Sequence, residues 1–490
     1  MPDKFYRKEK ICIVLNLFVS VMLILIEQVT AISDYFTFML VYSIFSLCIY
    51  MYMIFLEIRY YEGLTIRFLF LIGALVRLSV PSVEKSIAML TEEVSQLQFM
   101  GNDITNYVFP TILWINLYYM VFLYFFIRFS KGYTLERSFL PVLQKFRVDI
   151  FSVIFYAIGY AYNLYSLAFP VGFIPSIIQN ALTNLANVGL LMIVVDTAYN
   201  YTRGKYVLML LEVAGLVYYG LFYSFYKSVI VLPLLLLVLY YFMRSFQYKK
   251  KIFNIKLVLV AGTIVLFFTF FVYPFMSTKR VEADFQAQTN RAMATYSNED
   301  IIKDVIQGET QMEENSNAMD RLDVVSPNSF FYGDVDRHKQ HHWDLVESNI
   351  KLMIPRFLYP EKEDNNTGLK AYSYALTGSF NNYSFYNCYI FVGLFAGAFF
   401  AGGWVFALFM AIVNGIVFAK YSDYMIKNIS NIFALIFFFS LAMNVLSAFE
   451  EVHDGGIMRC IGFSINAIIV FVINLLLKTK KHENTIHIQE

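Results

Sequence analysis

Apolar segments of about 20 residues recur along this chain, and short polar stretches separate them. The first two segments, residues 11–32 and 35–56, are each long enough to cross the hydrocarbon core of a bilayer as a helix. A soluble protein of 490 residues could not bury a composition that is 58% hydrophobic, whereas a bilayer can accept it. The pattern therefore predicts an all-α, polytopic helical membrane protein with about 12 transmembrane helices.

Basic residues predict how these helices are oriented. Lys4, Arg7, Lys8 and Lys10 precede the first apolar segment, and five Lys or Arg residues lie within 244–256. Positive charge favours the cytoplasmic side, so we expect both termini in the cytoplasm. The first segment is too long for the apolar core of a cleavable signal peptide. The four cysteines form no CxxC pair, so neither a disulfide framework nor a thiolate metal site is expected.

The largest interruption of this pattern is a polar insert of roughly 100 residues, and loops of this length are uncommon unless they have a function. The sequence predicts three regions: an N-terminal transmembrane bundle of about nine spans at 1–276, a large extracytoplasmic loop at 277–382, and about three spans with a cytoplasmic tail at 383–490. We expect the loop to supply one half of an active site and the membrane helices the other half.

Three cations are the leading candidates for a role in chemistry. Arg321 and Arg356 lie in the loop, and the guanidinium group offers a permanently charged fork of donors that matches diphosphate oxygens. Pro355 and Pro360 bracket the segment of Arg356 and restrict its backbone. Lys227 begins the expected eighth span, where a cation could hold a lipid diphosphate. The alternatives are surface salt bridges for the arginines and a lysine that reaches back to the interface.

Polar side chains inside expected spans form a second group. Arg77 lies towards the outer end of the expected third span, residues 66–80, and a charge there is unfavourable unless it is paired or faces water. We expect an outer loop at residues 81–106 after that span, with an amphipathic stretch around 87–99 that lies on the membrane surface. An ion pair of Arg77 with Glu27 or Glu212 is the structural alternative. Three asparagines of the sixth span share one helix face and predict either a sugar-binding cavity or a helix contact: Asn180, Asn184 and Asn187.

Histidines and carboxylates of the outer loops are candidates for a general base. His338 and His342 would share a helix face next to Trp343, but the HExxH glutamate is missing and no third ligand follows at a recognised spacing. We therefore expect no metal, and a histidine that acts as a base or stacks on a sugar. The other candidates are carboxylates: Glu347, Glu450 and Glu451. The last two belong to a loop that could equally be a solvated turn on Gly455 and Gly456.

This layout resembles the bacterial repeat-unit polymerases of O-antigen, capsule and exopolysaccharide (Wzy-type) and the related O-antigen ligases. Three short motifs carry the resemblance: SFYKS at 224–228, IPRFLYPEK at 354–362 and FVGLFAG at 391–397. The likeness covers the whole chain in layout and about 60 residues in motif. Ligases usually place a histidine with an asparagine before the span at 391–397, where this chain has SFNN at 379–382. That departure favours a polymerase over a ligase.

The resemblance implies a metal-independent membrane glycosyltransferase without a cofactor, in the bacterial cytoplasmic (inner) membrane, with the large loop on the periplasmic or extracellular side. Its implied partners are an undecaprenyl-diphosphate-linked oligosaccharide and membrane lipid, with a chain-length regulator and a flippase as further candidates; no nucleic acid is expected. The implied catalytic residues are Arg321, Arg356, Lys227, His338, His342, Glu347, Glu450 and Glu451. The implied substrate-binding residues are Arg77, Asn180, Asn184, Asn187, Lys279, Arg280, Tyr359, His453 and Arg459. The alternatives are an O-antigen ligase with lipid A-core as acceptor, or a polysaccharide or lipid transporter, although the chain shows no internal repeat.

Overall fold

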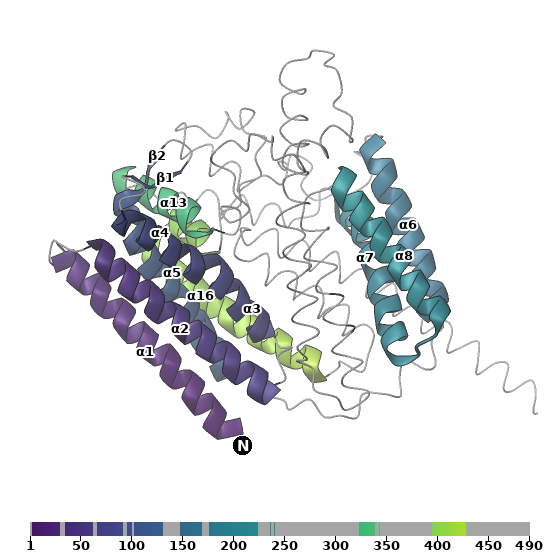
Figure 1. The fold of residues 1–490 in the computed structure, drawn as a ribbon, viewed down its shortest axis with the longest axis horizontal. Helices are drawn as coiled ribbons and strands as arrows, with labels where there is room; N and C mark the ends of the chain where they lie inside the picture. The colour runs from purple at the N-terminus through teal and green to yellow at the C-terminus, as the bar shows by residue number, and fades with distance from the viewer. Residues whose placement is uncertain are drawn as a thin grey trace, which may run out of the picture. The chain divides into compact units, whose positions relative to one another are not determined.

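The computed structural model describes residues 2–29, 35–61, 66–91, 96–99, 102–130, 148–168, 176–223, 236, 240, 323–338, 343 and 394–427. This part of the chain is helical apart from one small hairpin, and it divides between two compact units (Figure 1). Among these residues, four stretches are long and apolar enough to cross a membrane: Arg7–Glu27, Tyr35–Arg59, Thr105–Phe129 and Gly397–Lys420. The expected all-α membrane class is confirmed to that extent. The count of about 12 spans and the large loop remain predictions.

The first unit holds most of the described helices. Its elements are α1 (Pro2–Val29), α2 (Tyr35–Tyr61), α3 (Ile66–Ala74), the π-helical turn η1 (Leu75–Ser79), α4 (Val80–Leu90), β1 (Gln98–Phe99), β2 (Asn102–Asp103), α5 (Thr105–Phe129), α13 (Val325–His338) and α16 (Leu394–Lys427). Helices α1, α13 and α16 pack against α5, while α2 packs against α3 and α4. Helix α13 lies with the hairpin at the end of this unit opposite the start of α1 (Figure 1).

The side chains of α1 and α2 are distributed as in a protein surrounded by lipid. Phe18 and Val41 are each 62% exposed, whereas Asn16, Ser20 and Tyr42 are buried between the helices. Ser20 Oγ and Tyr42 Oη lie 2.6 Å apart, and Ser20 Oγ donates to the backbone carbonyl of Asn16 at 2.7 Å. A soluble protein would turn these faces the other way, because its apolar side chains leave water. Buried polar contacts of this kind hold membrane helices together.

A second polar contact joins α2 to α5. Ser46 Oγ donates to Asn116 Oδ1 at 2.7 Å, and the hydroxyl of Tyr50 donates to the same oxygen at 3.2 Å. The amide nitrogen of Asn116 donates to the carbonyl of Ile112 at 3.0 Å, one turn earlier in α5. The buried amide is therefore satisfied on both sides, which fixes the register of α2 on α5.

The expected start of an outer loop at Pro81 is wrong, because the helix continues through η1 and α4 to Leu90. The proline ring crowds the carbonyl of residue 77, four positions earlier, and a wider helical turn relieves that contact. In η1 the N–H of Val80 donates to Leu75, which is the wider spacing of a π-helix. The end of the expected amphipathic stretch, residues 98–99, pairs with 102–103 as a β-hairpin instead.

Helix α5 contains a second proline, Pro110, which leaves the carbonyl of Asn106 without its usual donor. The hydroxyl of Tyr35, at the start of α2, donates to that carbonyl at 3.2 Å and accepts the N–H of Phe109 at 3.2 Å. Upstream, Asp103 Oδ1 accepts the N–H of Thr105, the first residue of α5, at 2.9 Å. The hydrogen bonds from Thr105 hold the pKa of Asp103 below its ordinary value.

Helix α16 corresponds to the expected tenth span and is broken near its start. Gly402 and Gly403 leave the helical conformation, and Gly403 has φ 69°, which a residue with a side chain rarely adopts. Farther along, a Cβ on Gly415 would lie 2.6 Å from the carbonyl oxygen of Phe122, so this glycine allows α16 to approach the backbone of α5 closely. Lys420 Nζ donates to the carbonyl of Phe129 at the C-terminal end of α5 at 3.3 Å.

The second unit contains α6 (Val148–Ala168), α7 (Ser176–Tyr199) and α8 (Arg203–Tyr223), which correspond to the expected fifth to seventh spans. Helices α6 and α7 touch through glycine: a Cβ on Gly159 would lie 2.2 Å from the backbone nitrogen of Ala186, and one on Gly189 would lie 2.5 Å from that of Tyr156. At the turn between α7 and α8, Lys205 Nζ lies 2.6 Å from Asp196 Oδ2.

Candidate functional site

Helix α13 belongs to the segment predicted as an extracytoplasmic loop, yet its apolar side chains are packed into the first unit. Phe330 and Phe331 are 1% and 0% exposed. Phe331 meets Phe400 of α16 edge to face, with ring centroids 5.3 Å apart. At Gly333 a Cβ would lie 2.6 Å from a ring carbon of Tyr107 in α5. This part of the predicted loop therefore docks on the membrane helices.

Stacked aromatic rings form the other side of this contact. Trp114 of α5 stacks on Trp404 of α16 with centroids 3.5 Å apart, immediately after the break at Gly403. Tyr332 stacks on Phe399 at 5.4 Å and lies 5.4 Å from Trp404. Burial raises the pKa of the Tyr332 hydroxyl above its ordinary value. The break in α16 therefore brings aromatic side chains from both of its halves against α13.

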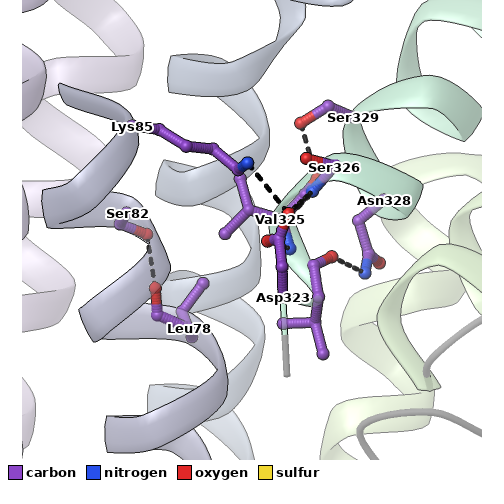
Figure 2. Close-up of polar contacts among 9 residues, drawn as sticks. Leu78, Ser82, Lys85, Asp323, Val325, Ser326, Asn328 and Ser329 are labelled. Carbon is purple, nitrogen blue, oxygen red and sulfur yellow. Dashed lines mark hydrogen bonds and ion pairs between the residues drawn. The ribbon is translucent and has the colours of Figure 1, made fainter. Parts of the chain in front are cut away.

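The start of α13 is fixed by a carboxylate that makes two kinds of contact (Figure 2). Asp323 Oδ1 accepts the N–H groups of Val325 at 2.7 Å and Ser326 at 3.3 Å, as an N-cap does. Asp323 Oδ2 lies 2.9 Å from Lys85 Nζ of α4. The side chains of Lys85 and Asp323 are only 17% and 7% exposed, so this ion pair is mostly shielded from solvent.

A backbone hydrogen bond joins the same segment to the π-helical turn. The N–H of Val324 donates to the carbonyl of Arg77 at 3.2 Å. Residue 81 is a proline and cannot supply the N–H that would bond this carbonyl within an α-helix. The contact therefore brings residue 324 of the predicted loop against Arg77, the arginine that the sequence singled out in the expected third span. π-Helical turns are frequent at functional sites.

The structure places only some of the predicted site residues. Arg77 lies in η1, where its charge interacts with Tyr119 of α5. His338 ends α13, and the three asparagines lie on α7, where Asn187 is half-buried. Arg77 and α13 belong to one unit and the asparagines to the other. The remaining candidates lie outside the described residues: Lys227, Lys279, Arg280, Arg321, His342, Glu347, Arg356, Tyr359, Glu450, Glu451, His453 and Arg459.

Sequence reasoning missed both members of the Lys85–Asp323 pair. Asp323 had a signal, because an aspartate just before a helix with Pro327 in its first turn is typical of an N-cap. No local sequence pattern pointed to Lys85, because its ion pair joins two residues that are far apart in the chain.

A buried charged cluster at the start of α3 was also missed. Arg67 Nη1 donates to Glu9 Oε2 of α1 at 3.1 Å, and Arg67 Nη2 lies 2.8 Å from Glu57 Oε1 of α2. The side chains of Arg67, Glu9 and Glu57 are 4%, 1% and 0% exposed. The guanidinium also lies 5.9 Å from the ring centroid of Phe126 in α5. Arg67 therefore joins four helices through charge and packing.

No group of three His, Cys, Asp or Glu side chains that could hold a metal occurs within the described ranges. Comparisons with protein-family models, curated proteins and solved structures found no match to this chain. Any assignment of function therefore depends on the chain's own residues and on the resemblance in layout and motif.

Proposed function

We propose that this protein is a polysaccharide polymerase, a membrane glycosyltransferase that joins undecaprenyl-diphosphate-linked repeat units of O-antigen, capsule or exopolysaccharide. The observation that carries the proposal is the hydrogen bond from Val324 to the carbonyl of Arg77 at 3.2 Å. It joins Val324, just before the start of α13 in the predicted extracytoplasmic loop, to Arg77, the cation of the expected third span. A reaction between lipid-linked glycans needs such a junction, because the diphosphate lies at the membrane surface and the sugars lie in water.

The proposed reaction transfers a growing glycan to a new repeat unit. A hydroxyl of the acceptor attacks the anomeric carbon of the donor, the new glycosidic C–O bond forms, and the bond to the diphosphate oxygen breaks. The transition state is oxocarbenium-like, and negative charge builds up on the leaving undecaprenyl diphosphate. Fixed cations aimed at that charge are the main requirement, and Lys227, Arg321 and Arg356 are the proposed catalytic cations, with Arg77 as a substrate-binding cation.

The proton of the acceptor hydroxyl passes to a base. The proposed bases are His338, His342, Glu347, Glu450 and Glu451. Because the donor is already activated as a diphosphate, the reaction as proposed uses no nucleotide sugar. In this proposal the enzyme lies in the bacterial inner membrane, with both termini in the cytoplasm and the site at the periplasmic or outer face.

The test is reconstitution of the full-length protein in liposomes with purified undecaprenyl-diphosphate-linked repeat units. A ladder of longer glycans on the same lipid supports a polymerase. Transfer only to added lipid A-core would indicate a ligase, and movement of the glycan across the bilayer without a new bond would indicate a transporter.

Arg356→Ala and Arg356→Lys provide the matched variants for that assay. If the guanidinium fork grips two diphosphate oxygens, lysine replaces the charge but not the paired geometry. Both variants should then lose about 30- to 1000-fold in rate, which corresponds to roughly 2–4 kcal/mol of transition-state stabilisation. A normal ladder from Arg356→Ala would remove this residue from the site.

A further inference from the structure

We propose that Lys85 and Asp323 are positioning residues for the transfer reaction, which makes this inference dependent on the function proposed above. Their ion pair holds α13 on α4, and α13 belongs to the loop that carries the predicted cations Arg321 and Arg356. Arg77 lies eight residues before Lys85, in the continuous helix that α3, η1 and α4 form over residues 66–90. The pair would thereby fix α13 relative to Arg77.

Two adjacent residues, Asp323 and Val324, contact this continuous helix at two positions. Val324 donates its N–H to the carbonyl of Arg77 at 3.2 Å, and Asp323 contacts Lys85 Nζ at 2.9 Å. Residues 77 and 85 are about 12 Å apart along a helix axis. The side chain of Lys85 spans part of that distance, because helical side chains lean towards the N-terminus. Figure 2 shows it extended from α4 towards Asp323. Two separated contacts fix both the position of the segment and its direction.

The carboxylate of Asp323 is itself held in place, so the ion pair has a defined geometry. One oxygen is engaged by the N–H groups of Val325 and Ser326, and the other faces Lys85. Fixed, poorly exposed pairs keep more of their electrostatic attraction than mobile surface pairs do. In the sequence, Arg321 is separated from the anchored residue Asp323 by Leu322 alone.

Charge changes at the two positions should not be equivalent. Lys85→Met removes the cation and leaves Asp323 at the helix N-terminus, where a negative charge is favourable. Asp323→Asn keeps a capping oxygen but leaves the Lys85 cation beside the positive end of α13. The double variant removes that repulsion. We therefore expect Asp323→Asn to release α13 more than Lys85→Met does, and the double variant to resemble Lys85→Met.

The first measurement is hydrogen–deuterium exchange of the α13 amides in the full-length protein in lipid nanodiscs. In Lys85→Met, the amides in the first turns of α13 should exchange about 5- to 30-fold faster, because those turns open more often. This is the range expected for the loss of one partly buried charge-assisted contact. Lys85→Arg keeps the charge and should restore slow exchange. Glu84→Gln is the matched control, because it removes an exposed charge from the neighbouring position of α4.

The second measurement is the rate of glycan joining by the same samples. Loss of positioning should lower kcat about 10-fold, because it weakens contacts made to the leaving diphosphate in the transition state, while KM should stay within about 2-fold. Lys85→Arg should recover kcat. If the pair only stabilised the fold, the amount of folded protein would fall while kcat per folded molecule stayed unchanged.

Unchanged exchange in both Lys85→Met and Asp323→Asn would overturn the inference, because the pair would not hold the helix. Faster exchange with an unchanged kcat would overturn it as well, since the helix would be held but would not position the reaction. An inactive wild-type protein would refute the proposed function and the role in transfer together, while the exchange rates would still report whether Lys85 anchors α13.

Discussion

Removing Arg67 should destabilise the first unit more than any change at an exposed charge near it. The guanidinium contacts Glu9 Oε2 at 3.1 Å and Glu57 Oε1 at 2.8 Å, and all three side chains are at most 4% exposed. In Arg67→Met, two carboxylates remain buried close together without their cation. Because α1, α2 and α3 each contribute one of these side chains, the loss acts on the packing of three helices at once.

The size of the effect follows from this burial. Removing one member of a buried ion pair costs about 3–5 kcal/mol, because an uncompensated charge stays behind. The triple variant Glu9→Met, Glu57→Met, Arg67→Met leaves no charge behind, and apolar replacements of buried ion triads are often neutral or stabilising. We therefore expect the triple variant to be more stable than Arg67→Met alone. Lys8→Met, an exposed neighbour of Glu9, should change stability by less than about 0.5 kcal/mol.

The assay is reversible unfolding of the purified protein in mixed micelles of increasing denaturing detergent, followed by tryptophan fluorescence. Two of the three tryptophans, Trp114 and Trp404, stack on each other in the first unit, so their signal reports its packing. An Arg67→Met protein as stable as the wild type would refute the reasoning. A triple variant that is less stable than Arg67→Met would also refute it, because the loss of stability would then come from a change in packing volume and not from unpaired charges.

Three further predictions test other contacts. Gly189→Ala should separate α6 from α7 and cost about 1–3 kcal/mol when unfolding is followed by far-ultraviolet circular dichroism, whereas Gly204→Ala, where a Cβ meets nothing within 4 Å, should be tolerated. Pro81→Ala restores an N–H that competes for the carbonyl of Arg77, so the amide of Val324 should exchange with solvent faster in a hydrogen–deuterium exchange experiment. A cysteine introduced at Gln340 should react with a membrane-impermeant thiol reagent in intact cells, and labelling only after rupture would overturn the predicted topology.

The membrane class could be predicted because hydropathy is a local property of the sequence. Apolar runs such as 11–32 and 35–56 predict helices close to α1 and α2 whatever the rest of the chain does. The continuation of the helix past Pro81 could not be predicted in the same way. A proline usually marks a boundary, but here a π-helical turn accommodates Pro81 and the helix runs on to Leu90.

The contacts of the candidate site were harder to predict, for a different physical reason. An arginine in a span is visible as an unfavourable residue, so Arg77 could be singled out from the sequence. Its contact with Val324 could not, because nothing local to either residue specifies a partner nearly 250 residues away. The same holds for Lys85 with Asp323. Within α13, the adjacent aromatic residues Phe330 and Phe331 were a local sign of burial, because large apolar side chains favour the interior, and both are buried in the structure.

Pro81 and Pro110 suggest how such contacts arise. Each removes a donor from a helix and leaves a carbonyl to be satisfied from elsewhere: Val324 N–H reaches Arg77, and the Tyr35 hydroxyl reaches Asn106. Within a membrane, a freed carbonyl must find its donor in the protein, because lipid offers none. A proline near the end of a helix can therefore act as a docking point for another segment. Val324, which precedes α13, supplies the donor for the carbonyl of Arg77. Pro81 therefore both widens the helix and frees the carbonyl that anchors the start of α13.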